Sequence, residues 1–423
     1  MNQPNKGKKM NQLVKSVAIT LPIFLIIGCG DLDKPSNERV IGGEIVVDFS
    51  AKMMKESLIS QGMVDENSTV FGYKAYKIPY TTTDEEGLEV KVSGLFVIPT
   101  GMPPAVDQIG LSMVSDDHGT IFANADAPSV IGSNKGTPDG SSIILTSMGG
   151  FATLQPDYIG FGDSNDHYHP FILKKSLASA TIDFIKAVKS FSTNNKIKLN
   201  NQLFLTGYSE GGYATLATLQ KIEADAELTV TMANPMAGPY DLNVTAFGVL
   251  SAPTLSVPSF MAELGYAYAK AYDQTLSTII NEPYASKLPT LVDGSLQREA
   301  IDAELTYETT GANGLFNPTF VGSFFADPNY WFREAMLENS VHAWSPETSV
   351  RLIHCEGDEV IPYGIAQITE ATMNAMGAED VALIPVEATL GLDANMTHGE
   401  CGLKAYGLTT QIFSDVRKAT IGY

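Results

Sequence analysis

Short apolar runs separated by polar turns recur along most of this chain. Two β-rich runs, Phe71–Tyr80 and Val90–Pro99, flank the turn-like sequence Asp84-Glu85-Glu86-Gly87, which predicts a hairpin. Other apolar runs have the length of buried strands. They lie at Ile109–Val114, Ala152–Asp157, Leu203–Leu205, Leu228–Met232, Val350–His354 and Val381–Val386.

Helical periodicity occurs between these strands. A helix predicted over Leu173–Phe191 places its large apolar residues on one face. Further helices are predicted at Tyr213–Leu219 and at roughly Ala405–Arg417. Strands that alternate with helices predict an α/β fold, a mostly parallel sheet covered by helices on both faces.

The alternation stops between Asn243 and Thr348. Ser259–Ile280 and Pro328–Leu337 have helical patterns, and the stretch is rich in aromatic residues. We interpret residues 243–348 as a helical cap inserted into the α/β core. Any single aromatic residue is best explained by the cap's own core, whereas the group would also suit a lid over an apolar pocket.

Charge limits the partners of this protein. The chain has 423 residues and a net charge of −21. A surface this acidic repels nucleic acid and anionic lipid headgroups. We expect no nucleic-acid partner, and we expect a monomer.

The first residues are typical of a targeting signal. Lysines precede the apolar segment Val17–Ile27, which is short and is interrupted by Pro22. It ends in Ile26-Ile27-Gly28-Cys29, which resembles a bacterial lipobox and implies cleavage before Cys29 and acylation of its thiol. Residues 1–28 would then be a lipoprotein signal peptide and residues 29–44 a tether. The protein would be exported and anchored by lipid to the membrane of the cell envelope. An ordinary cleaved signal with an incidental cysteine is the alternative.

The clearest chemical motif is Gly207-Tyr208-Ser209-Glu210-Gly211-Gly212, between a predicted strand and a predicted helix. A Gly-x-Ser-x-Gly turn in that context is the nucleophile elbow of an α/β-hydrolase. The glycines at 207 and 211 avoid collisions that a β-carbon would cause in so tight a turn. We therefore predict Ser209 as a catalytic nucleophile; the alternative is a passive serine in a glycine-rich loop.

A nucleophilic serine needs a base and an acid, and in this fold the acid precedes the histidine in the chain. His398 follows the last predicted strand and is the predicted base. The other histidines precede Ser209 (His118, His167, His169), lie at the cap exit (His342) or lie within a strand (His354). Asp358 follows Gly357 just past the strand Val350–His354 and is the predicted acid, with Glu356 and Glu359 as rivals.

Acyl transfer also needs N–H donors that bind an oxyanion. Glu210 should supply one backbone donor, and one of His118, Gly119 and Thr120 should supply the other. The polar segment Asp163–His169 could hold a cation, but it lacks EF-hand spacing. We interpret it as a loop beside the active site and expect no metal.

Two cysteines lie near the predicted acid and base. Cys355 is three residues before Asp358, and Cys401 is three residues after His398. Export would place them in an oxidising compartment, and if the acid and base meet, so do their neighbours. We predict a disulfide between Cys355 and Cys401; two buried free thiols are the alternative.

Several segments together resemble the bacterial branch of the secretory-lipase-like α/β-hydrolases, related to fungal lipase A. They come in the family's order from about residue 73 to the C-terminus. They are His118-Gly119-Thr120, Pro156-Asp157-Tyr158 with Gly160 and Gly162, His169-Pro170, the elbow, Gly357-Asp358 with Ile361-Pro362-Tyr363, and Thr397-His398. The resemblance implies a helical cap, no cofactor, and hydrolysis of carboxylic esters or acylglycerols by Ser209, Asp358 and His398. Ahead of its His-Gly the family often has aromatic and glutamine residues; this chain has Met113–Asp117, so Asp116 and Asp117 could alter which substrates are tolerated.

The sequence therefore predicts a serine esterase or lipase that forms an acyl-enzyme intermediate and takes a small-molecule or lipid ester. Its core would comprise residues 45–242 and 349–423. A serine peptidase of the same fold is one alternative, in which Asp116-Asp117 or Glu359 would bind a peptide amine. A non-catalytic surface-binding lipoprotein is the other.

Overall fold

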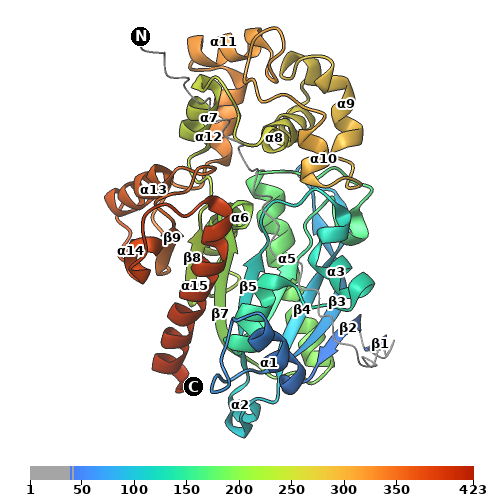
Figure 1. The fold of residues 1–423 in the computed structure, drawn as a ribbon, viewed down its shortest axis with the longest axis vertical. Helices are drawn as coiled ribbons and strands as arrows, with labels where there is room; N and C mark the ends of the chain where they lie inside the picture. Colours follow the sequence, from blue (N-terminus) through green and yellow to red (C-terminus); the bar gives the residue numbers. More distant parts are fainter. Residues whose placement is uncertain (1–38, 41) are drawn as a thin grey trace, which may run out of the picture.

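The computed structural model describes residues 39–40 and 42–423, and in this part of the chain a single mixed sheet of ten strands forms the centre of the molecule (Figure 1). The strand order is β1-β2-β3-β4-β6-β5-β7-β8-β9-β10. Neighbours are antiparallel from β1 to β6 and parallel from β6 to β10. The predicted signal peptide and Cys29 lie outside the described residues, as does the tether up to residue 38.

The strands confirm most of the apolar pattern, including the hairpin of β3 and β4. Their bounds are β1 Arg39–Val40, β2 Gly43–Phe49, β3 Gly72–Thr83, β4 Glu89–Thr100, β5 Leu111–Asp117, β6 Ala152–Pro156, β7 Leu199–Tyr208, β8 Met232–Met236, β9 Val350–His354 and β10 Val381–Pro385. The prediction at Leu228–Met232 was wrong, because the strand begins only at Met232. Residues Met232–Met236 pair with Phe204–Tyr208. Asn234 and Pro235 interrupt the apolar run of this strand, so the apolar pattern did not predict it.

The helices cover both faces of the sheet, as predicted (Figure 1). In β7, Leu203 and Leu205 belong to the core under α5 and α6, while Phe204 points to the opposite core with Phe413 of α15. This alternation is the period of two expected of a strand buried on both sides. The helices of the core are α1 Ala51–Ser60, α2 Pro104–Ile109, α3 Pro128–Lys135, α4 Gly140–Ser142, α5 Lys174–Asn194, α6 Glu210–Asp225, α13 Tyr363–Ala375, α14 Val386–Leu390 and α15 His398–Ile421.

Six further helices gather beyond one end of the sheet, within the segment predicted as a cap (Figure 1). They are α7 Leu242–Ser251, α8 Pro258–Ala271, α9 Tyr284–Leu291, α10 Arg298–Asp302, α11 Pro318–Ala326 and α12 Trp331–Asn339. Phe320, Phe324 and Phe332 are buried, and the Phe332 ring contacts both of the others. Many of the aromatic side chains therefore form the core of this helical group.

Within the described residues, none of the helices combines the length and apolarity that a membrane crossing requires.

Candidate active site

Ser209 stands at the junction of β7 and α6 with a positive φ of 61°. A non-glycine residue held in this region stores strain on the order of 1–3 kcal/mol, which the surrounding structure must offset. Here the Ser209 N–H donates a 2.9 Å hydrogen bond to the Met236 carbonyl at the end of β8. The turn is therefore fixed to the neighbouring strand.

Three glycines make this turn possible. A β-carbon on Gly211 would lie 1.8 Å from the Asp117 carbonyl oxygen, and one on Gly207 would lie 2.4 Å from the same atom. A β-carbon on Gly212 would lie 2.2 Å from the Met236 carbonyl oxygen. These distances explain the glycines of the motif, because α6 begins against the backbone of β5 and β8.

The loop after β5 lies against the elbow. A β-carbon on Gly119 would be 2.9 Å from the Tyr208 carbonyl oxygen and 3.6 Å from the Ser209 Cβ. His118 Nδ1 lies 2.8 Å from the Gly119 carbonyl oxygen, and its Nε2 lies 3.2 Å from the Asp157 carbonyl oxygen. The His118 ring therefore braces the loop, and Gly119 follows it beside Ser209.

Asp116 and Asp117 do not face this site. Both are fully buried at the end of β5. Asp116 accepts hydrogen bonds from Tyr406 and Ser141, and burial raises its pKa to about 7. Asp117 accepts a hydrogen bond from Thr181. Their side chains are bonded inside the core, so neither carboxylate is exposed to bind a peptide amine.

Asp358 lies in the loop after β9, and its side chain is buried. Its Oδ1 accepts backbone hydrogen bonds from Val360 and Ile361, and its Oδ2 lies 2.7 Å from Nδ1 of His398. Burial alone would raise the pKa of this carboxyl, but hydrogen bonds from His354 and His398 hold it well below its usual range. Asp358 is therefore an ionised partner for His398.

The rival carboxylates have other positions. Glu356 is exposed. Glu359 accepts a 2.9 Å hydrogen bond from the backbone N–H of His398. Asp358 alone of the three contacts the imidazole, and Glu359 holds the backbone that carries it.

His398 is the first residue of α15, which begins seven residues earlier than the predicted helix. Thr397 caps the helix and forms a capping box with Glu400. The Tyr208 hydroxyl donates a 2.6 Å hydrogen bond to the His398 carbonyl oxygen, and the centroids of the two rings are 4.9 Å apart. The residue before Ser209 thus contacts the predicted base directly.

The predicted disulfide between Cys355 and Cys401 is present, with the two Cα atoms 6.0 Å apart. It joins the end of β9, just before Asp358, to the first turn of α15. A buried carboxylate, Glu387, accepts hydrogen bonds from the backbone N–H groups of Glu356 and Gly357 and fixes the same loop. The structure therefore holds the acid and the histidine together through a covalent bond as well as a hydrogen bond.

Behind the elbow lies a buried ionisable group that the sequence patterns did not indicate. Nε2 of His169 lies 2.8 Å from the Glu210 carboxylate, and its Nδ1 lies 2.9 Å from the Ile159 carbonyl oxygen. Burial opposes the charged form of His169, but Glu210 outweighs it and raises the pKa to about 9. Glu263 of α8 is buried in the electrostatic field of this pair, and its burial raises its own pKa to about 8.

The segment Asp163–His169 is therefore not organised as a cation site. His169 is bonded to Glu210, Asp163 pairs with Lys77 at 2.6 Å, and His167 pairs with Asp166. Helix α8 lies over this region, since Tyr268 donates a hydrogen bond to the Ile172 carbonyl oxygen. Phe260 of α8 also stacks on Phe122, which follows the loop His118–Thr120 in the chain.

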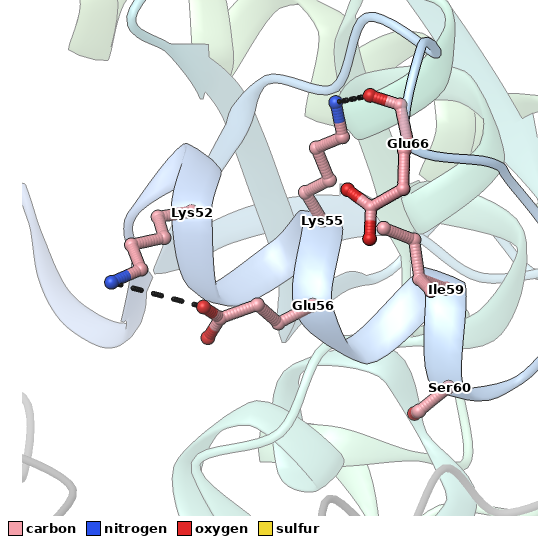
Figure 2. Close-up of a pocket in the computed structure, with 6 residues that line it drawn as sticks. All are labelled: Lys52, Lys55, Glu56, Ile59, Ser60 and Glu66. Atoms are coloured by element: carbon pink, nitrogen blue, oxygen red, sulfur yellow. Dashed lines mark hydrogen bonds and ion pairs between the residues drawn. The ribbon is translucent and has the colours of Figure 1, made fainter.

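A surface hollow of about 420 Å³ lies on α1, far from the elbow (Figures 1 and 2). Figure 2 shows its lining of lysine and glutamate side chains, with Lys52 paired to Glu56 and Lys55 bonded to the Glu66 carbonyl oxygen. These exposed groups pair with one another and offer no nucleophile with an adjacent base. This hollow is therefore not a candidate active site.

The sequence matches no protein-family model, and no curated protein matches it. Solved structures, in contrast, match most of the chain. A candidate hydrolase from Legionella pneumophila matches with a TM-score of 0.79 and 22% identity, over 90% of this chain and 99% of the other. The rice cell wall degrading esterase LipA from Xanthomonas oryzae gives 0.73 and 23%, over 91% and 98%. Candida antarctica lipase A in its closed state gives 0.55 and 18%, over 74% and 72%. These likenesses show that the chain has the predicted α/β-hydrolase fold.

Proposed function

We propose that this α/β-hydrolase-fold protein is a serine esterase or lipase that cleaves carboxylic esters through an acyl-enzyme intermediate. One observation carries the proposal: Nδ1 of His398 lies 2.7 Å from a buried, ionised Asp358, and Tyr208 ties that histidine to the strained elbow at Ser209. The esterase and lipase among the structural neighbours support the same chemistry and the resemblance to the secretory-lipase-like family.

The mechanism follows from the roles of the three side chains. Because Nδ1 of His398 donates to Asp358, its Nε2 is the nitrogen left to take the Ser209 proton. The Ser209 Oγ attacks the ester carbonyl carbon, and the resulting oxyanion is bound by the Glu210 N–H and a second donor from the loop His118–Thr120. The ester C–O bond then breaks, and the leaving alcohol takes the proton from His398.

A water molecule completes the cycle. His398 removes a proton from the water as it attacks the acyl-enzyme, and the proton passes to Ser209 as the acid is released. Asp358 remains ionised throughout and stabilises the imidazolium by its charge. The peptidase alternative is weaker, because Asp116, Asp117 and Glu359 are all committed to other contacts.

Substitution of the three side chains tests this proposal. We expect Ser209→Ala to lower kcat on p-nitrophenyl butyrate by at least about 10³-fold without unfolding the protein. Asp358→Asn should also reduce kcat strongly, whereas Glu356→Gln, which changes an exposed carboxylate in the same loop, should leave it unchanged. Retained activity in Ser209→Ala would refute the assignment, and failure of a fluorophosphonate probe to label Ser209 would favour a binding protein without catalysis.

The location of the protein and its division into domains belong to the same proposal. Residues 1–28 would be removed as a lipoprotein signal, acylated Cys29 would anchor the protein, and the cap at 243–348 would cover the site of a monomeric enzyme. Mass spectrometry of the N-terminal peptide tests the anchor, since it should show an acylated Cys29. Release of a Cys29→Ala form into the soluble envelope fraction would support it, and an unmodified Cys29 would contradict it.

A further inference from the structure

His354 is the last residue of β9 and is fully buried. Its Nε2 lies 2.9 Å from the Ile361 carbonyl oxygen and 3.2 Å from Oδ2 of Asp358. Both of these atoms are acceptors, so Nε2 must carry a hydrogen and donate it between them. The strand pattern had counted His354 as a residue inside a strand and gave it no role.

The Asp358 carboxylate consequently has four donors. Two backbone N–H groups, from Val360 and Ile361, bond Oδ1, whereas His398 and His354 share Oδ2. The hydrogen bond from His398 is the shorter, at 2.7 Å against 3.2 Å. The two imidazoles thus share the oxygen that orients the predicted base.

A histidine at this position has a cost that an aliphatic residue would avoid. Its Nδ1 is buried and has no hydrogen-bond partner among the described residues. An unsatisfied buried polar atom destabilises a protein by on the order of 1–3 kcal/mol, whereas a valine or leucine at the end of a buried strand carries no such penalty. Packing therefore does not explain the imidazole, but its contact with the acid does.

We propose that His354 is a positioning residue of the catalytic acid, whose hydrogen bond fixes the orientation of the Asp358 carboxylate and draws charge from the oxygen that His398 uses. The inference rests on the proposed function, because it assigns His354 to the same triad. Tyr208 lies in the electrostatic field of Asp358, Glu359 and Glu387, and the ring facing His354 from α13 is Tyr363. Among the residues that the structure describes, His354 is the only side chain besides His398 that donates a hydrogen bond to Oδ2.

Loss of this donor should have two consequences. The carboxylate would attract the protonated His398 ring more strongly, so the acidic limb of the kcat/KM profile should move to higher pH by about half a unit. The carboxylate would also be oriented less firmly, and kcat should fall about ten-fold with little change in KM.

Two variants separate these effects from simple destabilisation. His354→Met fills a similar volume without a donor, whereas His354→Gln can place an amide N–H near the position of Nε2. We expect the Met variant to show both changes and the Gln variant to recover most of the wild-type profile. If the Met variant does not fold, His354→Asn replaces it, because its shorter amide lies where the unpartnered Nδ1 was.

The control is Leu352→Ala, which disturbs a buried residue of β9 away from the acid. It should lower the melting temperature without moving the acidic limb. The inference is overturned if the Met and Gln variants have the wild-type pH profile and kcat, or if both change in the same way as Leu352→Ala. Activity that persists in Ser209→Ala would instead refute the proposed function, so the two failures are distinguishable.

Discussion

The Tyr208 hydroxyl donates a hydrogen bond of 2.6 Å to the backbone carbonyl of His398, a residue 190 positions later in the chain. Tyr208 immediately precedes the proposed nucleophile, and its ring also lies against the His398 ring. A β-carbon on Gly402 would be 3.6 Å from the Tyr208 ring, so the first turn of α15 packs closely on this side chain. The contact sets the position of α15 relative to the elbow, and with it the position of the proposed base.

Removal of the Tyr208 hydroxyl should therefore affect catalysis as well as stability. We expect Tyr208→Phe to lower kcat/KM about three- to ten-fold and the free energy of unfolding by about 1 kcal/mol, the usual net value of one hydrogen bond. The matched control is Tyr423→Phe, which loses a 2.7 Å hydrogen bond to the Gly110 carbonyl oxygen at the other end of the core. Equal kcat/KM values for the two variants would show that the Tyr208 contact does not position the base.

The disulfide should stabilise the region that carries Asp358 and His398. Cys355 and Cys401 are 46 residues apart, and closing a loop of this length is worth about 4 kcal/mol in the chain-entropy model. We expect the double variant Cys355→Ala/Cys401→Ala to unfold at clearly lower urea concentration and to lose activity at lower temperature. Reductant should destabilise the wild-type protein and leave the double variant unaffected. Two reactive thiols in a denatured, unreduced Cys29→Ser form would contradict the bridge.

Gly119 offers a test of the loop beside the nucleophile. A methyl group at this position would lie 2.9 Å from the Tyr208 carbonyl oxygen, so the loop must move away from Ser209 in Gly119→Ala. A displacement near 1 Å at an active site can cost on the order of 100-fold in rate, and we expect kcat to fall about 10- to 100-fold. Gly364→Ala is the control, because a β-carbon there meets no atom within 4 Å. Steady-state kinetics decide, and an active Gly119→Ala would exclude this segment as the source of an oxyanion donor.

Much of the fold could be predicted because its determinants are local. Apolar runs predicted the parallel strands apart from β8, and the glycines at 207 and 211 are required by the approach of the Asp117 carbonyl. The order of Ser209, Asp358 and His398 identified the residues that the proposal uses. The predicted disulfide followed from the closeness of its cysteines to two of these residues.

The buried polar contacts around the candidate site could not be predicted, because no local sequence pattern specifies them. The sequence pattern places His354 within a strand and indicates no role for it. Its contact with Asp358 forms because the loop after β9 folds back and brings the carboxylate to Nε2 of His354. The pair of His169 and Glu210 joins positions 41 residues apart. Glu263 reaches their neighbourhood from α8, in a segment whose sequence shows only helical and aromatic patterns. Such polar contacts inside a core are set by tertiary packing.

Two buried ionisable side chains behind the elbow, His169 and Glu263, predict a loss of stability at alkaline pH. Interaction with Glu210 raises the pKa of His169 to about 9, so its contribution is complete below pH 6.5 and is lost as pH rises through 9. Burial raises the pKa of Glu263 from 4.5 to about 8, so the folded protein retains a proton that the unfolded chain releases. Stability therefore falls with rising pH between 4.5 and 8 on account of Glu263, and the two windows overlap from 6.5 to 8.

Glu263→Gln should remove the loss of stability that the ionisation of Glu263 causes as pH rises. Glutamine has the shape of the protonated carboxyl and does not ionise, so we expect melting temperatures close to wild type at pH 5 and about 2–5 °C above it at pH 9. Glu334→Gln, an exposed change of equal charge on α12, should give a difference from wild type that hardly varies with pH. Thermal unfolding followed by circular dichroism across this range makes the comparison. If the curves of Glu263→Gln and the wild-type protein stay parallel from pH 5 to 9, the buried carboxyl does not titrate as the structure requires.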